Sequence, residues 1–239
     1  MRIATFALTD IGLKRKVNQD AYLRDDELGL YIVADGMGGH KGGEVASWLA
    51  VEGIRDFYKK NKEMSGSEVL DKGINICCQE IYNQSLQHEE LSGMGTTVLA
   101  SLLQNDTLYI GQVGDSRAYL LTGGCIWQIT EDHSLLNEEI RSGRISPGQV
   151  AGYQFKNVIT RSVGYESTVV VDIYTRKVKV NDIYLLCTDG LSGLVGESEM
   201  LSEIQSGGLD AGVKKLVALA NERGGDDNIT ALACHVLEL

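Results

Sequence analysis

The sequence has almost no proline, no long hydrophobic run and no excess of positive charge. Only one of its 239 residues is proline. No segment approaches the roughly 18 consecutive apolar residues that a membrane-spanning helix needs, and the N-terminus lacks the charged and then apolar order of a signal peptide. With 43% hydrophobic and 23% charged residues, the chain is expected to be globular and to form one domain over residues 1–239.

The charge balance and the cysteines limit the possible partners and the compartment. A formal net charge of -11 argues against nucleic-acid binding, because a nucleic-acid site normally presents a basic face. The acidic excess is typical of a solvated surface, to which a divalent-cation site would add carboxylates. The five cysteines have no Cys-x-x-Cys spacing and lie in apolar stretches. We expect buried thiols in a reducing, cytoplasmic compartment.

Several familiar site motifs are absent. No His-x-x-x-His pair or cysteine cluster offers a zinc site, and Cys-x5-Arg, which would indicate a cysteine nucleophile, does not occur. The glycine-rich run after Asp35 fails as a dinucleotide loop because residue 41 is lysine. It fails as a P-loop because Lys41 precedes Gly42. A nucleotide-binding protein is therefore a weak hypothesis.

The apolar patterning predicts consecutive strands with helices between them. The predicted strands are residues 2–8, 20–24, 28–35, several between 94 and 129, 168–176, 182–188 and 229–237. The predicted helices are residues 43–60, 67–90, 133–143 and 209–222. Because strands cluster in runs and do not alternate regularly with helices, the order favours antiparallel sheets with helices packed outside.

Aspartates recur where predicted strands begin or end. Asp35 and Asp189 each follow an apolar strand and precede a glycine, and Gly36 would let the backbone approach an ion closely enough for its carbonyl to bind. Asp20, Asp115 and Asp227 lie at comparable positions. Each alone is typical of a turn. Together they favour a hard-cation site, since oxygen-only ligands select Mg²⁺ or Mn²⁺ over Zn²⁺.

Eight segments together resemble the metal-dependent protein phosphatases, the type-2C or PPM serine/threonine phosphatases, in their bacterial branch. They keep the family's order and spacing from about residue 9 onward. The segments are RKVNQDA (15–21), VADGMGGHKGGEVAS (33–47), GMGTT (93–97), VGDSRAY (113–119), EDHS (131–134), NVITRSVG (157–164), LLCTDGL (185–191) and GGDDNIT (224–230).

The resemblance implies an α+β fold, a four-layer α-β-β-α sandwich of two antiparallel sheets face to face with helices on both outer sides. It also implies two Mn²⁺ or Mg²⁺ ions bridged by Asp35, with the Gly36 carbonyl on one of them and Asp189 and Asp227 on the other. Asp20 would hold a metal-bound water, and Asp115 would serve a third metal position.

Arg15 matches the arginine that binds the substrate phosphate, and its planar fork suits phosphate oxygens. The implied reaction is direct attack on phosphorus by a water that the cations activate, with no covalent intermediate. The substrates would be phosphoserine and phosphothreonine proteins, so the enzyme would reverse a cognate Ser/Thr kinase and act as a monomer. The alternative is a pseudophosphatase that acts as a binding module.

Two departures leave parts of the site open. Many eukaryotic members carry a histidine after the first Asp-Gly, where this chain has Met37. His40 stands three residues on and either serves the site or only caps the turn or faces solvent, and a metal-bound water could protonate the leaving group instead. Arg161 is either a second phosphate-binding cation or a structural ion pair. Residues 144–158 match the family's variable flap in place but not in sequence, so the substrate is not readable there.

Overall fold

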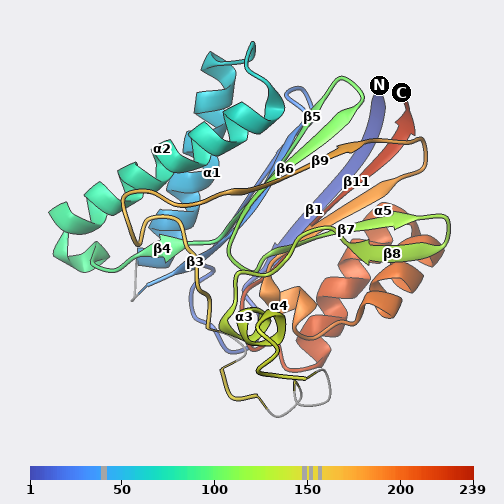
Figure 1. Cartoon of the computed structure of the whole chain (residues 1–239). Coiled ribbons are helices and arrows are strands. Elements are labelled where there is room, and N and C mark those ends of the chain that lie inside the picture. Colours follow the sequence, from blue (N-terminus) through green and yellow to red (C-terminus); the bar gives the residue numbers. More distant parts are fainter. Residues whose placement is uncertain (39–41, 147–149, 151–152, 156–157) are drawn as a thin grey trace.

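Two antiparallel sheets lie face to face in the computed structural model (Figure 1), which describes residues 1–38, 42–146, 150, 153–155 and 158–239. The first sheet has the order β1-β11-β10-β7-β8, and the second has the order β2-β3-β5-β6-β9 with β4 paired to β3. The strands of the two sheets are β1 (Arg2–Asp10), β2 (Asp20–Asp25), β3 (Leu30–Met37), β4 (Gly95–Thr96), β5 (Val98–Gln104), β6 (Thr107–Val113), β7 (Arg117–Thr122), β8 (Cys125–Gln128), β9 (Asp172–Lys177), β10 (Ile183–Cys187) and β11 (Ile229–Glu238).

Helices cover both outer faces of the two sheets (Figure 1). The helices are α1 (Gly42–Lys60), α2 (Gly66–Gln87), the short 3₁₀ turn η1 (Glu89–Leu91), α3 (Leu135–Arg141), α4 (Asp189–Ser192) and α5 (Glu197–Glu222). The pair α1 and α2 packs on the second sheet, and α5 packs on the first. The α+β four-layer prediction is confirmed. None of the helices described is long and apolar enough to span a bilayer.

Strand β3 shows why the apolar runs are continuous. Leu30, Ile32 and Ala34 pack against the helices α1 and α2, whereas Tyr31 and Val33 face the other sheet. Successive side chains of a strand point to opposite faces, so a strand covered on both faces must be apolar at every position. The layer between the sheets is completed by residues such as Leu120, Leu186 and Leu232.

Several predicted bounds differ from the structure. Helix α5 begins at Glu197 and not at residue 209. It consists of two helical segments that meet at a kink at Gly208, where φ is 72°. Strand β9 begins at Asp172 and not at residue 168. The predicted flap, residues 144–158, lies partly outside the described residues. Four of the cysteines are buried as expected, but Cys125 is exposed because it begins β8, at the edge of its sheet.

Candidate metal centre

Most of the predicted site residues line one cleft of about 390 Å³, which we call the aspartate cleft, and Asp20 is paired with one of them. Asp20 and Asp35 are direct partners in the β2–β3 ladder. Asp115 lies between β6 and β7, Asp189 follows β10, and Asp227 precedes β11. The cleft is lined by Arg15, Gln19, Asp35, Gly36, Met37, Gly38, Thr97, Asp115, Ile159, Asp189 and Asp227.

The backbone of Asp35 is fixed by two hydrogen bonds with Thr97. The Asp35 amide donates to the Thr97 hydroxyl at 2.9 Å, and the Thr97 amide donates to the Asp35 carbonyl at 2.8 Å. Thr97 also shares a hydroxyl hydrogen bond of 2.8 Å with Ser116, the residue after Asp115. This network ties the end of β3 to the turn that carries Asp115, so the two carboxylates are held in one wall.

Glycine is the only residue type that fits at position 36. A Cβ atom there would lie 2.0 Å from the Gly43 carbonyl oxygen and 2.5 Å from the Gln19 carbonyl oxygen. Both neighbours are backbone atoms and cannot rotate away. The glycine is needed because other backbone segments approach it closely. Binding of an ion by the Gly36 carbonyl stays a prediction.

Asp20 lies below the cleft and is held by two hydroxyl groups. Thr188 and Thr230 donate to its Oδ2 at 2.9 Å and 2.6 Å. Its second oxygen, Oδ1, is buried and has no hydrogen-bond partner, and Oδ1 of Asp189 is in the same state. Buried acceptors are normally satisfied. Two such carboxylate oxygens beside an acidic cleft fit a site that takes divalent cations, which bind carboxylate oxygen directly.

Burial and mutual repulsion raise the pKa values of these carboxyls. Burial raises the pKa of Asp20 to about 7, and nearby Asp189 and Asp227 add to the rise. Burial also raises the pKa of Asp115 to about 7, with Asp189 contributing. The pKa of Asp35 is raised well above its usual range by burial and by its acidic neighbours. Charged carboxylates are therefore costly here unless a cation compensates them.

The carboxylates of the aspartate cleft do not form a closed cage around a metal position. Among the described residues, no three His, Cys, Asp or Glu side chains already enclose a metal position. Cations bound here would need the Gly36 carbonyl and water to complete their shells, which suits Mg²⁺ because it keeps several waters and uses only one or two carboxylates. The donors lining the cleft are oxygen atoms, so the residues present fit hard cations.

Arg15 and Arg161 occupy different environments. Arg15 lines the aspartate cleft and forms an ion pair with Asp227 at 2.6 Å. Arg161 is not among the residues that line the cleft. Its guanidinium donates to Asp172 at 2.7 Å and lies 3.2 Å from Nε2 of His133. The ion pair with Asp172 matches the structural alternative for Arg161, and His40 lies outside the described residues.

The sequence reasoning missed several residues that hold the ligands in place. Asn228 accepts from the Gln19 amide at 2.8 Å and donates to the carbonyls of Ile11 and Val17. It thus joins the segment before β2 to the segment before β11. Asn228 stands in the matched segment GGDDNIT, as does Thr230, and Thr188 stands in LLCTDGL. Their presence inside the motifs was the signal that could have found them.

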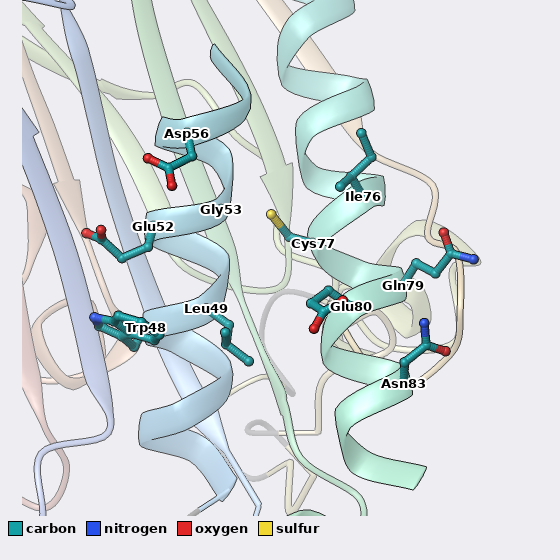
Figure 2. Close-up of a pocket in the computed structure, with 10 residues that line it drawn as sticks. All are labelled: Trp48, Leu49, Glu52, Gly53, Asp56, Ile76, Cys77, Gln79, Glu80 and Asn83. Carbon is teal, nitrogen blue, oxygen red and sulfur yellow. The ribbon is translucent and has the colours of Figure 1, made fainter. Parts of the chain in front are cut away.

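A second cleft of similar size lies away from these aspartates. It is a groove of about 410 Å³, which we call the interhelical groove, and none of the predicted site residues lines it. Figure 2 shows its lining residues on α1 and α2. It is lined by Trp48, Leu49, Glu52, Gly53, Asp56, Ile76, Cys77, Gln79, Glu80 and Asn83.

The chain is similar to protein phosphatases along nearly its whole length. A family model described as Protein phosphatase 2C matches residues 14–229. The chain is 38% identical over 232 residues to the serine/threonine phosphatase stp of Listeria welshimeri, covering 94% of this chain and 92% of that relative. It is 35% identical over 232 residues to the protein phosphatase PhpP of Streptococcus pneumoniae, covering 93% of each.

Solved structures give the same result. The crystal structure of the Mycobacterium tuberculosis serine/threonine phosphatase PstP/Ppp matches with a TM-score of 0.93 at 31% identity, covering 99% of both chains. The catalytic domain of PstP in complex with two manganese ions matches with a TM-score of 0.88 at 32% identity, again covering 99% of both. By its sequence, its fold and the aspartates that its strands bring together, this chain belongs to the protein phosphatase 2C family of metal-dependent serine/threonine protein phosphatases.

Proposed function

We propose that the aspartate cleft hydrolyses phosphoserine and phosphothreonine esters of proteins, with two Mn²⁺ or Mg²⁺ ions held by Asp35, the Gly36 carbonyl, Asp189 and Asp227, and Asp115 available to a third. The observation that carries the proposal is the pair of buried, unpartnered carboxylate oxygens on Asp20 and Asp189. Bound cations supply Lewis-acid chemistry, which makes water a nucleophile near neutral pH and offsets the charge of the phosphoryl group.

Asp20 is suited to orient the attacking water and to accept its proton. Its Oδ2 is held by Thr188 and Thr230, so Oδ1 has a fixed direction and remains free to accept a hydrogen bond.

Arg15 is suited to bind the substrate phosphate. Its guanidinium is half-exposed at the rim and pairs with Asp227. A cation that binds Asp227 would compete for the same carboxylate and leave the guanidinium fork available to phosphate oxygens. The ion pair therefore keeps the arginine near the cleft in the absence of cations.

We propose that water protonates the leaving group. Met37 lines the cleft and has no titratable proton, and the described lining residues include no histidine. The direct attack needs no protein nucleophile, which agrees with a cleft whose functional side chains are carboxylates and one guanidinium. The products would be an alcohol side chain and inorganic phosphate.

The proposal extends to the cellular setting. Phosphoserine and phosphothreonine arise from protein kinases, so a Ser/Thr kinase would supply the substrates. Four buried free thiols, Cys77, Cys78, Cys187 and Cys234, support a reducing, cytoplasmic location. The family match over residues 14–229 supports a single catalytic domain, with the flap near residues 144–158. We propose that this domain acts as a monomer.

The test is turnover of phosphoserine, phosphothreonine and phosphotyrosine peptides measured side by side. We expect release of phosphate from the first two with Mn²⁺, and none after EDTA. Asp35→Asn and Asp227→Asn should each lower kcat by about 10³-fold or more, since each removes an anionic ligand from the reacting centre. The matched control is Asp56→Asn in the interhelical groove, where a carboxylate of the same type should be dispensable.

Calorimetric titration with Mn²⁺ separates the enzyme from the binding-module alternative. The enzyme should bind at least two ions, and Asp227→Asn should bind fewer. Failure to bind two Mn²⁺ would favour the binding module. A folded wild-type protein that binds two Mn²⁺ and hydrolyses none of the three peptides would refute the proposed activity.

A further inference from the structure

A larger cleft adjoins the aspartate cleft and is not used by the chemistry above. We call it the flanking groove. It has a volume of about 840 Å³ and shares Met37 and Ile159 with the aspartate cleft. It is lined by Met37, Ile159, Thr160, Arg161, Ser162, Tyr165, Glu166, Thr168, Val169 and Val170. A chain that places a phosphorylated side chain in one cleft can therefore extend directly into the other.

One wall of the flanking groove is formed by the segment that begins at Ile159. Its ends are paired, because Ile159 forms a bridge with Ser134 and Val163 forms one with Thr96 of β4. Figure 1 shows this segment running beside β4 on its way to β9. Between the bridges, Arg161 and Ser162 form no backbone–backbone hydrogen bond with any described residue. A segment between two β-bridges whose backbone groups are unpaired with other backbone can pair with an extended peptide.

The loop of residues 164–170, which also lines the groove, is fixed to α2. The Gly164 amide donates to Sγ of Cys78, which in turn lies 3.1 Å from the Glu166 carbonyl oxygen. The Val169 amide donates to Oδ1 of Asn75 at 3.0 Å. These contacts hold the loop in place before any ligand binds, so little ordering is needed on binding.

The loop nevertheless leaves large apolar side chains uncovered. Tyr165 and Val170 are each 70% exposed, and Val169 is half-buried against the cluster beneath α1 and α2. The charge of Arg161 is compensated by Asp172 at 2.7 Å. The groove thus offers apolar surface beside a neutralised cation, which suits an apolar side chain better than a charged one.

We propose that the flanking groove binds the residues next to the phosphorylated serine or threonine of a protein substrate, and that it prefers an aliphatic side chain against Val169, Val170 and Tyr165. This inference rests on the proposed function, because it deepens the specificity of the same site. Its argument is the continuity of the two clefts through Met37 and Ile159. An extended peptide advances about 3.3 Å per residue, so a side chain within a few positions of the phosphorylated residue can reach this surface.

The experiment compares two phosphothreonine peptides with p-nitrophenyl phosphate, a substrate too small to fill both clefts. The peptides differ only in leucine or aspartate at the flanking positions. We expect the wild type to favour the leucine peptide by about 10-fold in kcat/KM. Val170→Asp should remove most of this preference through KM, and Tyr165→Ala should reduce it. Neither should alter turnover of p-nitrophenyl phosphate, because neither residue touches the aspartates.

The matched control is Trp48→Ala, which truncates an exposed aromatic side chain in the interhelical groove and should leave all three substrates unaffected. Because Val170 and Tyr165 are exposed, both variants should keep the wild-type melting temperature. Equal use of the two peptides by the wild type, or equal loss on both peptides in Val170→Asp, would overturn the inference while the phosphatase activity stands. Absence of turnover on every substrate would instead refute the proposed function, and the inference with it.

Discussion

The aspartate cleft and the interhelical groove are nearly equal in size, at about 390 and 410 Å³, and both are lined by carboxylates. In the groove these carboxylates belong to the outer surface of two helices, and Glu52 is paired with Arg55. In the cleft, burial and like charge raise the pKa values of Asp20, Asp35 and Asp115. Volume therefore does not mark the reactive site. Buried charge without a neutralising partner marks the reactive site instead, because such charge destabilises the fold and is retained only where a ligand compensates it.

The glycines of the two clefts should differ most in their response to substitution. Gly36→Ala places a Cβ atom 2.0 Å from a backbone carbonyl oxygen, whereas Gly53→Ala places one 2.6 Å from Sγ of Cys77. We expect Gly36→Ala to cost at least about 3 kcal/mol of stability, since backbone cannot rotate away, and to abolish turnover.

Gly53→Ala should cost far less, because the gain in helix propensity of roughly 1 kcal/mol offsets part of the overpacking. Denaturant unfolding and peptide turnover measure both variants, and Gly53→Ala combined with Cys77→Ala should recover wild-type stability. Equal effects of the two single substitutions would show that the cleft is not the more constrained region.

Stability without cations should fall as the pH rises. The pKa values of Asp20 and Asp115 are raised from 3.8 to about 7 in the folded protein, so the folded state binds more protons than the unfolded state between these values. Its stability is then greatest near pH 4 and declines toward pH 7. In EDTA we expect the melting temperature to drop over this window.

Added Mn²⁺ should remove most of that decline, because cations replace the protons on the same carboxylates. The stabilisation by Mn²⁺ should therefore be larger at pH 7.5 than at pH 5, as measured by thermal unfolding. A metal-free protein whose melting temperature rises from pH 4.5 to pH 7 would contradict the assigned charges of the cleft.

The hydroxyl groups that hold Asp20 should matter for turnover. Thr230→Val removes the 2.6 Å hydrogen bond to Asp20, and bonds to charged groups contribute about 1.5–3 kcal/mol. We expect roughly a 10-fold loss of kcat with Mn²⁺, because Asp20 would no longer be held in one orientation. The control is Thr107→Val, whose hydroxyl bonds Asp106 at the opposite end of β6, and its kcat should stay within twofold of wild type.

Removing a charge should give the smallest effects on stability, and the aspartate cleft and the interhelical groove should still differ in them. In EDTA at pH 7.5, Asp115→Asn should raise stability by about 1 kcal/mol, since it removes a buried carboxylate with a raised pKa. Glu52→Gln in the interhelical groove should change stability by less than roughly 0.5 kcal/mol. Chemical denaturation measures both variants. A loss of stability in Asp115→Asn would show that the aspartate is structural.

Much of the fold could be predicted from local patterns. The alternating and continuous apolar runs gave β1, β2, β3 and β11 to within two residues, and helical spacing gave α1. Helix α5 was predicted only from residue 209. The structure bends at Gly208, where φ is 72°, and the helix continues on both sides. Burial of Met200 and Ile204 stabilises the first segment, and no local signal reports that packing.

The sequence by itself determined the types of the ligands and their positions at strand ends, because strand periodicity and Asp-Gly turns are local properties of the chain. Only the tertiary structure decided how these residues act. It placed Thr188 and Thr230 on Asp20 across a separation of about 170 to 210 residues, and it placed Arg161 beside Asp172 and outside the aspartate cleft. The physical reason is that burial and repulsion between like charges depend on distances in space, and antiparallel pairing of strands such as β1 and β11 sets those distances.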